Sequence, residues 1–158
     1  MLKSRLDARS FLACLGVMLG VALSPGIADA ALGDPEASVS IDAAQLQASI
    51  KSSANRVGYR VHEIQLPSGT LLREFVSPDG NVFGVAWKGR YPPNLQQALG
   101  KYFDSYLSGA KLAHADRTHL QIQGSDLVVQ VQARMRAYSG RAYIPAAVPS
   151  SFNLGDLH

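Results

Sequence analysis

Residues 59–88 read YRVHEIQL-PSG-TLLREFVS-PDG-NVFGVAWK, and this stretch decides the fold. Three runs rich in apolar residues, 59–66, 70–77 and 81–88, are separated by two connectors of proline, a polar residue and glycine. Such a connector suits a three-residue hairpin loop, because proline presets φ at the first turn position and glycine takes the left-handed position. The segment 59–88 therefore predicts an antiparallel β-meander.

The loop type also predicts the register of this meander. Across the first loop Glu63 faces Arg73 and Val61 faces Phe75, and across the second loop Phe75 faces Phe83. A one-residue slip of the first hairpin would set Glu63 opposite Glu74, a like-charge pair that cross-strand energetics disfavour. In this register one face carries an aromatic group beside an arginine: Arg73, Phe75, Phe83 and Trp87.

A helix is expected over 93–108. Leu95, Leu99, Tyr102 and Tyr106 belong to an apolar stripe with helical spacing, preceded by two prolines and followed by Gly109. The small residues Gly84 and Ala86 mark the sheet face that this helix could approach most closely. Long strands are expected within 119–144, where apolar and polar residues alternate over 127–138 and Ser139-Gly140 breaks or bulges the pattern.

These elements predict an α+β domain, an antiparallel sheet of about five strands with one main amphipathic helix packed on it. The domain is expected to span 59–145. Before it, the segment 31–58 is predicted to contain a short strand near Val39 and Ile41, then a helix capped by Asp42. After it, residues 146–158 are predicted to form a flexible tail.

Residues 1–30 are predicted to be a secretory signal peptide. Lys3, Arg5 and Arg9 precede an apolar run over 11–23, and Ala28-Asp29-Ala30 is a small-x-small site, so cleavage is expected between Ala30 and Ala31. The apolar run is 13 residues long, whereas a membrane span needs about 20. We therefore expect an exported protein without an integral membrane segment. A periplasmic location fits best, with release outside the cell as the alternative.

Cleavage would remove the single cysteine, Cys14, so disulfides, cysteine nucleophiles and thiolate metal sites are excluded from the remaining 128 residues. Those residues contain 12 basic and 10 acidic side chains and no dense basic run. This balance predicts no nucleic-acid partner.

Several motifs of the chain occur together in one known family. They include Tyr59-x-Val61-His62-Glu63, Val82-Phe83-x-Val85-x-Trp87, and Met135-Arg136-Ala137-Tyr138-Ser139-Gly140-Arg141-Ala142-Tyr143. In combination they resemble a bacterial exported family known only as domain of unknown function 2844, over nearly the whole chain after residue 30. The resemblance implies export and a shared fold, and it implies no activity.

No catalytic, cofactor or metal signature is evident. The adjacent His62 and Glu63 would point to opposite faces of a strand and could not share one metal ion. HExxH and GxSxG are absent, and the prolines, serines and glycines of the connectors are explained as turn residues. A hydrolase would need a site assembled from dispersed residues such as His62, Glu74 and Ser139.

Two surfaces are candidates for binding a ligand or partner. The first is the aromatic face with Arg73, Phe75, Phe83 and Trp87, and the second is a set of arginines and tyrosines, Arg136, Tyr138, Arg141 and Tyr143. The leading interpretation is a non-enzymatic exported accessory or binding domain, whose partner is another envelope protein or a small ligand. The alternatives are the dispersed-site hydrolase and a structural envelope component that assembles through exposed strand edges.

Overall fold

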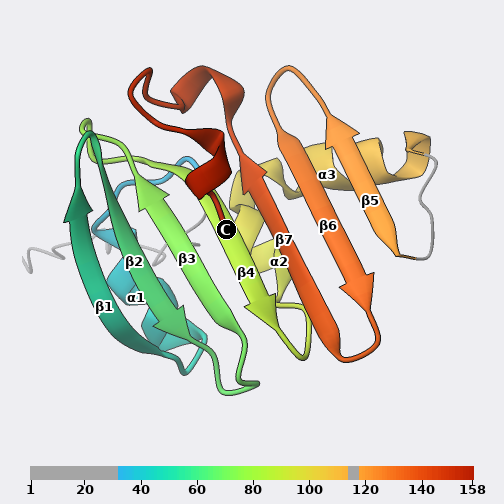
Figure 1. Cartoon of the computed structure of the whole chain (residues 1–158), viewed down its shortest axis with the longest axis horizontal. Coiled ribbons are helices and arrows are strands. Elements are labelled where there is room, and N and C mark those ends of the chain that lie inside the picture. The colour runs from blue at the N-terminus through green and yellow to red at the C-terminus, as the bar shows by residue number, and fades with distance from the viewer. Residues whose placement is uncertain (1–31, 114–117) are drawn as a thin grey trace, which may run out of the picture.

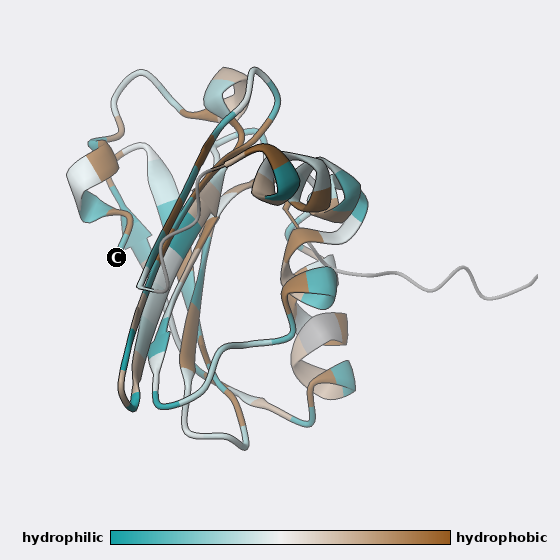
Figure 2. Ribbon diagram, turned by 90° about the vertical axis from the view of Figure 1, so that its right-hand side faces the viewer, coloured by the Kyte–Doolittle hydropathy of each residue, from teal (hydrophilic) through white to brown (hydrophobic). Residues whose placement is uncertain are grey.

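The computed structural model describes residues 32–113 and 118–158. These residues form an antiparallel sheet of seven strands, in the order β1-β2-β3-β4-β7-β6-β5, with helices on one side and the C-terminal segment on the other (Figures 1 and 2). We call the side under the helices the helix face and the opposite side the tail face. The fold is α+β, as predicted. The predicted signal peptide, 1–30, and its cleavage site at Ala30 and Ala31 lie outside the described residues.

The sheet consists of two antiparallel meanders joined by pairing between β4 and β7. The first contains β1 (Ser49–Arg56), β2 (Tyr59–Gln65), β3 (Leu71–Val76) and β4 (Val82–Gly89). The second contains β5 (His119–Gln123), β6 (Val128–Arg134) and β7 (Ala137–Tyr143). The helical elements are α1 (Ser38–Gln45), α2 (Leu95–Leu99), η1 (Gly100–Tyr102), α3 (Phe103–Leu112), η2 (Pro145–Ala147) and η3 (Leu154–Asp156).

The two predicted hairpin loops are confirmed. Gly69 and Gly80 take the left-handed conformation, with φ of 83° and 82°. In each loop the glycine N–H donates to the carbonyl of the residue before the proline, Leu66 or Ser77, at 2.9 Å. The predicted register of the first hairpin is also confirmed, because Glu63 pairs with Arg73 and Val61 with Phe75.

The predicted register of the second hairpin is wrong by one residue. Phe75 pairs with Gly84 rather than Phe83, because the register shifts between Phe75 and Val76. This irregularity leaves Phe83 as an extra residue, so that Phe83 packs with Phe75 on the tail face. After Phe83, the side chains of β4 point to the faces opposite to those predicted, and Trp87 therefore belongs to the core on the helix face.

The sequence predicted that the main helix packs closely on the sheet at Gly84 and Ala86. These two residues instead face the tail face, on the other side of the sheet. A Cβ added to Gly84 would lie 2.7 Å from Cδ1 of Leu157, and Ala86 packs in the same cluster as Leu157. The C-terminal segment, and not the main helix, comes close to the sheet at these small residues.

The sheet has seven strands instead of about five because the structure predicted for two parts of the chain was wrong. The residues predicted as a short strand near Val39 are helical in α1, and the polar segment 49–56 forms β1, the partner of β2. The expected long strand over 127–138 is split by a two-residue turn at Met135–Arg136, where Arg136 has φ of 59°. Ser139 and Gly140 lie inside β7, and Gly140 leaves room for the ring of Trp87.

The main helical segment covers 18 residues, 95–112, whereas the sequence predicted a helix over 93–108. It begins after Asn94, whose side chain accepts hydrogen bonds from the N–H groups of Gln96 and Gln97. It breaks at Gly100, which has φ of 47°, and then continues to Leu112. Gly109 does not end it. Instead, Gly109 allows close packing on β5, because a Cβ there would lie 2.5 Å from Cγ2 of Ile122.

The segments on either side of the expected domain belong to the same fold. Leu32 is fully buried, and main-chain hydrogen bonds join Gly33 and Asp34 to Val82. At the other end, the segment expected to be a flexible tail packs on the tail face, where Phe152 is 8% exposed and Leu157 is 1% exposed. Phe152 makes edge contacts with Phe75 and Phe83, with ring centroids 5.7 and 4.9 Å apart.

Candidate functional site

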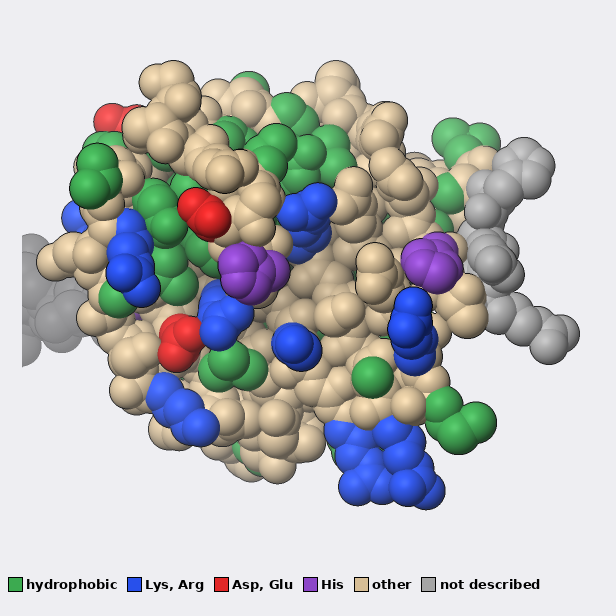
Figure 3. All heavy atoms as spheres, in the orientation of Figure 1, with side chains coloured by type: hydrophobic (Ala, Val, Ile, Leu, Met, Phe, Trp, Pro, Cys, Tyr) green, Lys and Arg blue, Asp and Glu red, His purple; other side chains and the backbone are tan. Residues whose placement is uncertain are grey.

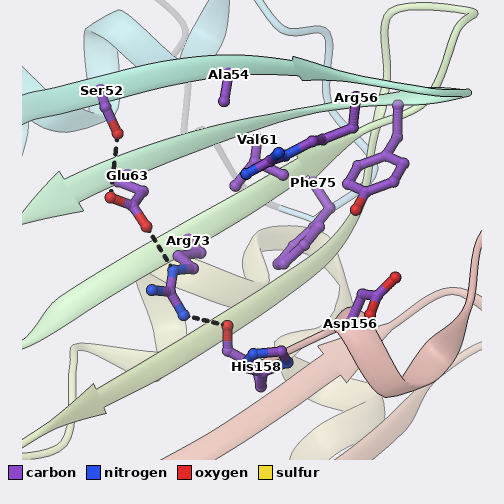
Figure 4. A pocket seen from close by; sticks show the side chains of 10 residues that line it. Ser52, Ala54, Arg56, Val61, Glu63, Arg73, Phe75, Asp156 and His158 are labelled. Carbon is purple, nitrogen blue, oxygen red and sulfur yellow. Dashed lines mark hydrogen bonds and ion pairs between the residues drawn. The ribbon is translucent and has the colours of Figure 1, made fainter.

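A groove opens on the tail face between the first three strands and the C-terminal segment (Figure 4). Its volume is about 470 Å³, within the range of about 300–1,000 Å³ that is typical of small-molecule sites. It is lined by polar and charged side chains around an apolar floor: Ser52, Ala54, Arg56, Tyr59, Val61, Glu63, Arg73, Phe75, Asp156 and His158.

The floor of this groove is set by the sheet register. Val61 and Phe75 are direct cross-strand partners on β2 and β3. Phe75 is held by the aromatic cluster around Phe152, and its ring centroid lies 6.2 Å from that of Tyr59. Phe152 of the C-terminal segment packs against both rings, so the apolar floor is held in place by aromatic contacts.

One wall is a chain of polar contacts that joins the sheet to the C-terminal segment. The Ser52 hydroxyl donates to Glu63 at 3.1 Å, and Nε of Arg73 donates to the same carboxylate at 2.7 Å. Arg73 also donates to the main-chain oxygen of His158 (Figure 4). The hydrogen bond from Arg73 holds the pKa of Glu63 below its usual value, with smaller contributions from Ser52 and from the charges of Arg73 and Lys51.

A second arginine holds the same segment further along. Arg141 on β7 donates to the main-chain oxygen of Leu154 at 2.8 Å and to the side-chain oxygen of Gln130 at 2.8 Å. The C-terminal segment is thus fixed by two guanidinium groups and by the buried side chains of Phe152 and Leu157. These contacts hold the C-terminal segment in one position beside the groove.

Two charged groups of the groove are left without a protein partner. Arg56 lies at the end of β1, and Asp156 lies on the C-terminal segment opposite (Figure 4). Neither side chain forms a hydrogen bond or ion pair with another described residue. The lining therefore offers one cation and one anion on opposite walls, available to a ligand.

The wider tail face is rich in basic side chains. Figure 3 shows several Lys and Arg side chains distributed over this face and few acidic ones. A second hollow, of about 370 Å³, lies on the other side of Arg73 and His158 and is lined in part by Lys88 and Ser139. The C-terminal residue His158 therefore lies between two hollows.

The structure divides the first predicted surface. Arg73 and Phe75 line the groove, and Phe83 lies fully buried beneath Phe152. Trp87 is 3% exposed in the core of the helix face. An aromatic surface with Arg73 therefore exists, but its rings come from Tyr59 and Phe75 instead of Trp87.

The second predicted surface is not brought together either. Arg141 and Tyr143 lie on the tail face, where Tyr143 packs beside the cluster of Phe75 and Phe83. Tyr138 is separated from Arg141 by three positions of the same strand and so points to the helix face. Arg136 occupies the turn between β6 and β7.

The residues considered for a dispersed hydrolase are separated by the sheet. His62 and Glu74 are cross-strand partners on the helix face, whereas Ser139 lines a hollow of the tail face. The structure brings other groups to His62: Ser53 from β1 and Glu36 from the segment before α1.

In residues 32–113 and 118–158, no three His, Cys, Asp or Glu side chains gather in a group that could hold a metal ion. Within the same ranges, no helix has the length and apolar character needed to cross a membrane.

The model of one protein family, described as "Protein of unknown function (DUF2844)", matches residues 28–157. The chain belongs to this family. No curated protein and no solved structure matches the chain. The description of this family assigns no activity.

Sequence reasoning missed Arg56, Asp156 and His158 because it placed Arg56 in the segment before the expected domain and the other two in a flexible tail. One signal was present for Arg56. The glycine of Val57-Gly58, with φ of 82°, closes the two-residue turn between β1 and β2, in which Arg56 pairs with Tyr59. No local pattern marks Asp156 and His158, because the long-range contacts of Arg73 and Arg141 hold their segment in place.

Proposed function

We propose that this protein is an exported, periplasmic binding domain whose groove takes a short zwitterionic ligand, such as a dipeptide with free ends. The observation that carries this proposal is a pair of charges, Arg56 and Asp156, on opposite walls of an apolar floor, neither of which has a partner among the described residues. Arg56 would receive the carboxylate, Asp156 the ammonium group, and Val61 and Phe75 an apolar side chain.

The chemistry of the lining favours this class of ligand over a purely apolar one. Burying a charged group without a partner is costly, so a ligand that covers Arg56 and Asp156 must supply opposite charges. Guanidinium groups bind carboxylates through paired N–H donors, and such charge-assisted hydrogen bonds are stronger than neutral ones. The Glu63–Arg73 ion pair already neutralises itself and therefore acts as a wall.

Binding would be tested by calorimetric titration with alanyl-phenylalanine and with its C-terminal amide. We expect the free dipeptide to bind about tenfold more tightly than the amide, because the amide lacks the charge that Arg56 recognises. In an Arg56→Ala variant this preference should disappear, while Arg134→Ala, which changes a residue outside the groove, should retain it. Equal affinity of the wild-type protein for the two compounds would contradict the proposal.

Export rests on the sequence of residues 1–30, and the described residues are compatible with cleavage after Ala30. Leu32 is fully buried and donates its N–H to Ala98, so a cut between Ala30 and Ala31 leaves the first core residue in place. The intact mass of protein recovered from the periplasm should correspond to a chain beginning at Ala31. Recovery only from the cytosol, with Met1 retained, would contradict export.

A further inference from the structure

A second group of polar side chains lies on the helix face, at the edge of the sheet formed by β1. Ser53 and His62 are cross-strand partners, and the Ser53 Oγ lies 2.7 Å from Nδ1 of His62. The other ring nitrogen, Nε2, lies 2.8 Å from Oε1 of Glu36. The His62 side chain is 13% exposed and that of Glu36 is 29% exposed. A hydroxyl, an imidazole and a carboxylate are therefore connected in that order.

The contacts of Glu36 determine which nitrogen of His62 carries the proton. Arg60 donates through Nε at 2.8 Å and through Nη2 to the Glu36 carboxylate, and this hydrogen bonding lowers the pKa of Glu36. An ionised carboxylate only accepts hydrogen bonds, so in the neutral imidazole the proton must be on Nε2. Nδ1 then has a free lone pair and accepts the hydroxyl proton of Ser53. This is the protonation state that a general base beside a serine requires.

We propose that Ser53 is a nucleophile and that Ser53, His62 and Glu36 form a hydrolytic site for carboxylic esters with short acyl groups. This inference goes beyond the proposed binding function and does not depend on the groove, which lies on the other face of the sheet. Ser53 and His62 are its catalytic residues. Glu36, held by Arg60, is a positioning residue.

The reaction proceeds in two balanced halves. Ser53 Oγ attacks the ester carbonyl carbon while its proton moves to Nδ1 of His62; the C–O bond then breaks and the alcohol leaves with that proton. Water next attacks the acyl-serine, gives a proton to Nδ1 and releases the carboxylic acid as Ser53 regains its proton. The imidazolium formed in each half is stabilised by Glu36 and lies beside the buried Glu74, its cross-strand neighbour on β3.

The position of Ser53 on β1 supplies the remaining requirements. β1 is an outer strand of the sheet, so alternate main-chain N–H groups along it point away from β2 and can donate to the oxyanion. Ser53 is exposed, which admits an ester from solvent. An open site of this kind suits a short acyl group that needs no deep pocket.

The test uses the full chain, with diisopropyl fluorophosphate as a serine-directed probe and p-nitrophenyl acetate as substrate. We expect one phosphorylated residue in the tryptic peptide 52–56, which fragmentation assigns to Ser53. Ser53→Ala should lose the label and lower ester hydrolysis at least about 100-fold, the usual scale for losing a catalytic group. Ser105→Ala is the matched control, because the hydroxyl of Ser105 also donates to a carboxylate, that of Asp126, outside both the groove and the proposed site, and it should react like wild type.

The role of Glu36 has a separate readout. Glu36→Gln should slow labelling of Ser53 about tenfold or more, and Glu36→Asp should restore part of the rate because it restores the carboxylate. Failure of the wild-type protein to label at Ser53, or equal ester hydrolysis by wild type and Ser53→Ala, would overturn the proposal. Because the first of these results is obtained on the unaltered protein, a variant that fails to fold does not obscure it.

Discussion

Two neighbouring rows of cross-strand partners show how the two faces of this sheet differ. On the helix face, one row is apolar across five strands: Ile64, Leu72, Trp87, Gly140 and Val131. On the tail face, the next row is mostly polar across seven strands: Ser52, Glu63, Arg73, Ala86, Arg141, Gln130 and Gln121. Each row is displaced from the other by a single residue along each strand.

The helices and the C-terminal segment cover these rows in different ways. The helices bury the apolar row, and Leu72 and Trp87 are 1% and 3% exposed. The C-terminal segment is held over the polar row by hydrogen bonds from Arg73 and Arg141, and it leaves a groove beside β1, β2 and β3. The apolar row therefore contributes mainly to stability, and the polar row forms part of a shaped, charged surface.

The largest expected effect is the loss of a side chain from the helix face. Leu72→Ala should lower the free energy of unfolding by about 3 kcal/mol, because a buried leucine leaves a cavity that its neighbours fill incompletely. Chemical denaturation followed by circular dichroism would measure this change. A loss below about 1 kcal/mol would show that the core on this face is not the main source of stability.

A smaller effect is expected for the buried aromatic residue of the C-terminal segment. Phe152→Ala should cost about 2 kcal/mol, less than a fully enclosed phenylalanine, because the segment can detach locally while the sheet stays folded. Limited proteolysis should then cleave the variant within 145–158 well before it cleaves the sheet. If the whole chain were degraded at one rate, the segment would be part of a single cooperative unit with the core.

The smallest effect should come from the polar row itself. The pKa of Glu63 is lowered in the folded protein by Arg73, so its contribution to stability is present above the ordinary value of 4.5 and is lost as the pH falls below it. Glu63→Gln should remove this part of the acid sensitivity, with a change in stability at neutral pH of about 1 kcal/mol or less.

Asp79→Asn is a suitable control for Glu63→Gln. Asp79 is exposed in the turn between β3 and β4 and forms no ion pair with another described residue. Urea denaturation between pH 3 and pH 7 would compare the variants. An unchanged pH dependence in Glu63→Gln would mean that the ion pair with Arg73 contributes nothing to folding.

The same comparison explains what could be predicted from the sequence. Proline and glycine in the two loops of residues 59–88 determine local geometry, so the meander and the pairing of Glu63 with Arg73 were predicted correctly. The displacement at Phe83 was not predictable, because it depends on packing against Phe152 from a distant segment. Trp87 was therefore assigned to the wrong face.

Other errors had a similar origin in long-range contacts. β1 has little alternation of apolar and polar residues, and it forms a strand because its main chain pairs with that of β2. Met135 and Arg136 lack the residues that usually mark a tight turn, although the chain reverses there. Of the candidate site, only Arg73 and Phe75 were predicted, since Arg56 comes from a segment placed before the expected domain and Asp156 from the segment predicted to be a flexible tail.

The main proposal is that the groove on the tail face binds a zwitterionic ligand. Two-dimensional ¹H–¹⁵N NMR of the domain, titrated with alanyl-phenylalanine, tests it most directly. We expect the chemical-shift changes to concentrate in β1, β2, β3 and residues 154–158. Shifts centred on the main helical segment 95–112, or no shifts at all, would contradict it.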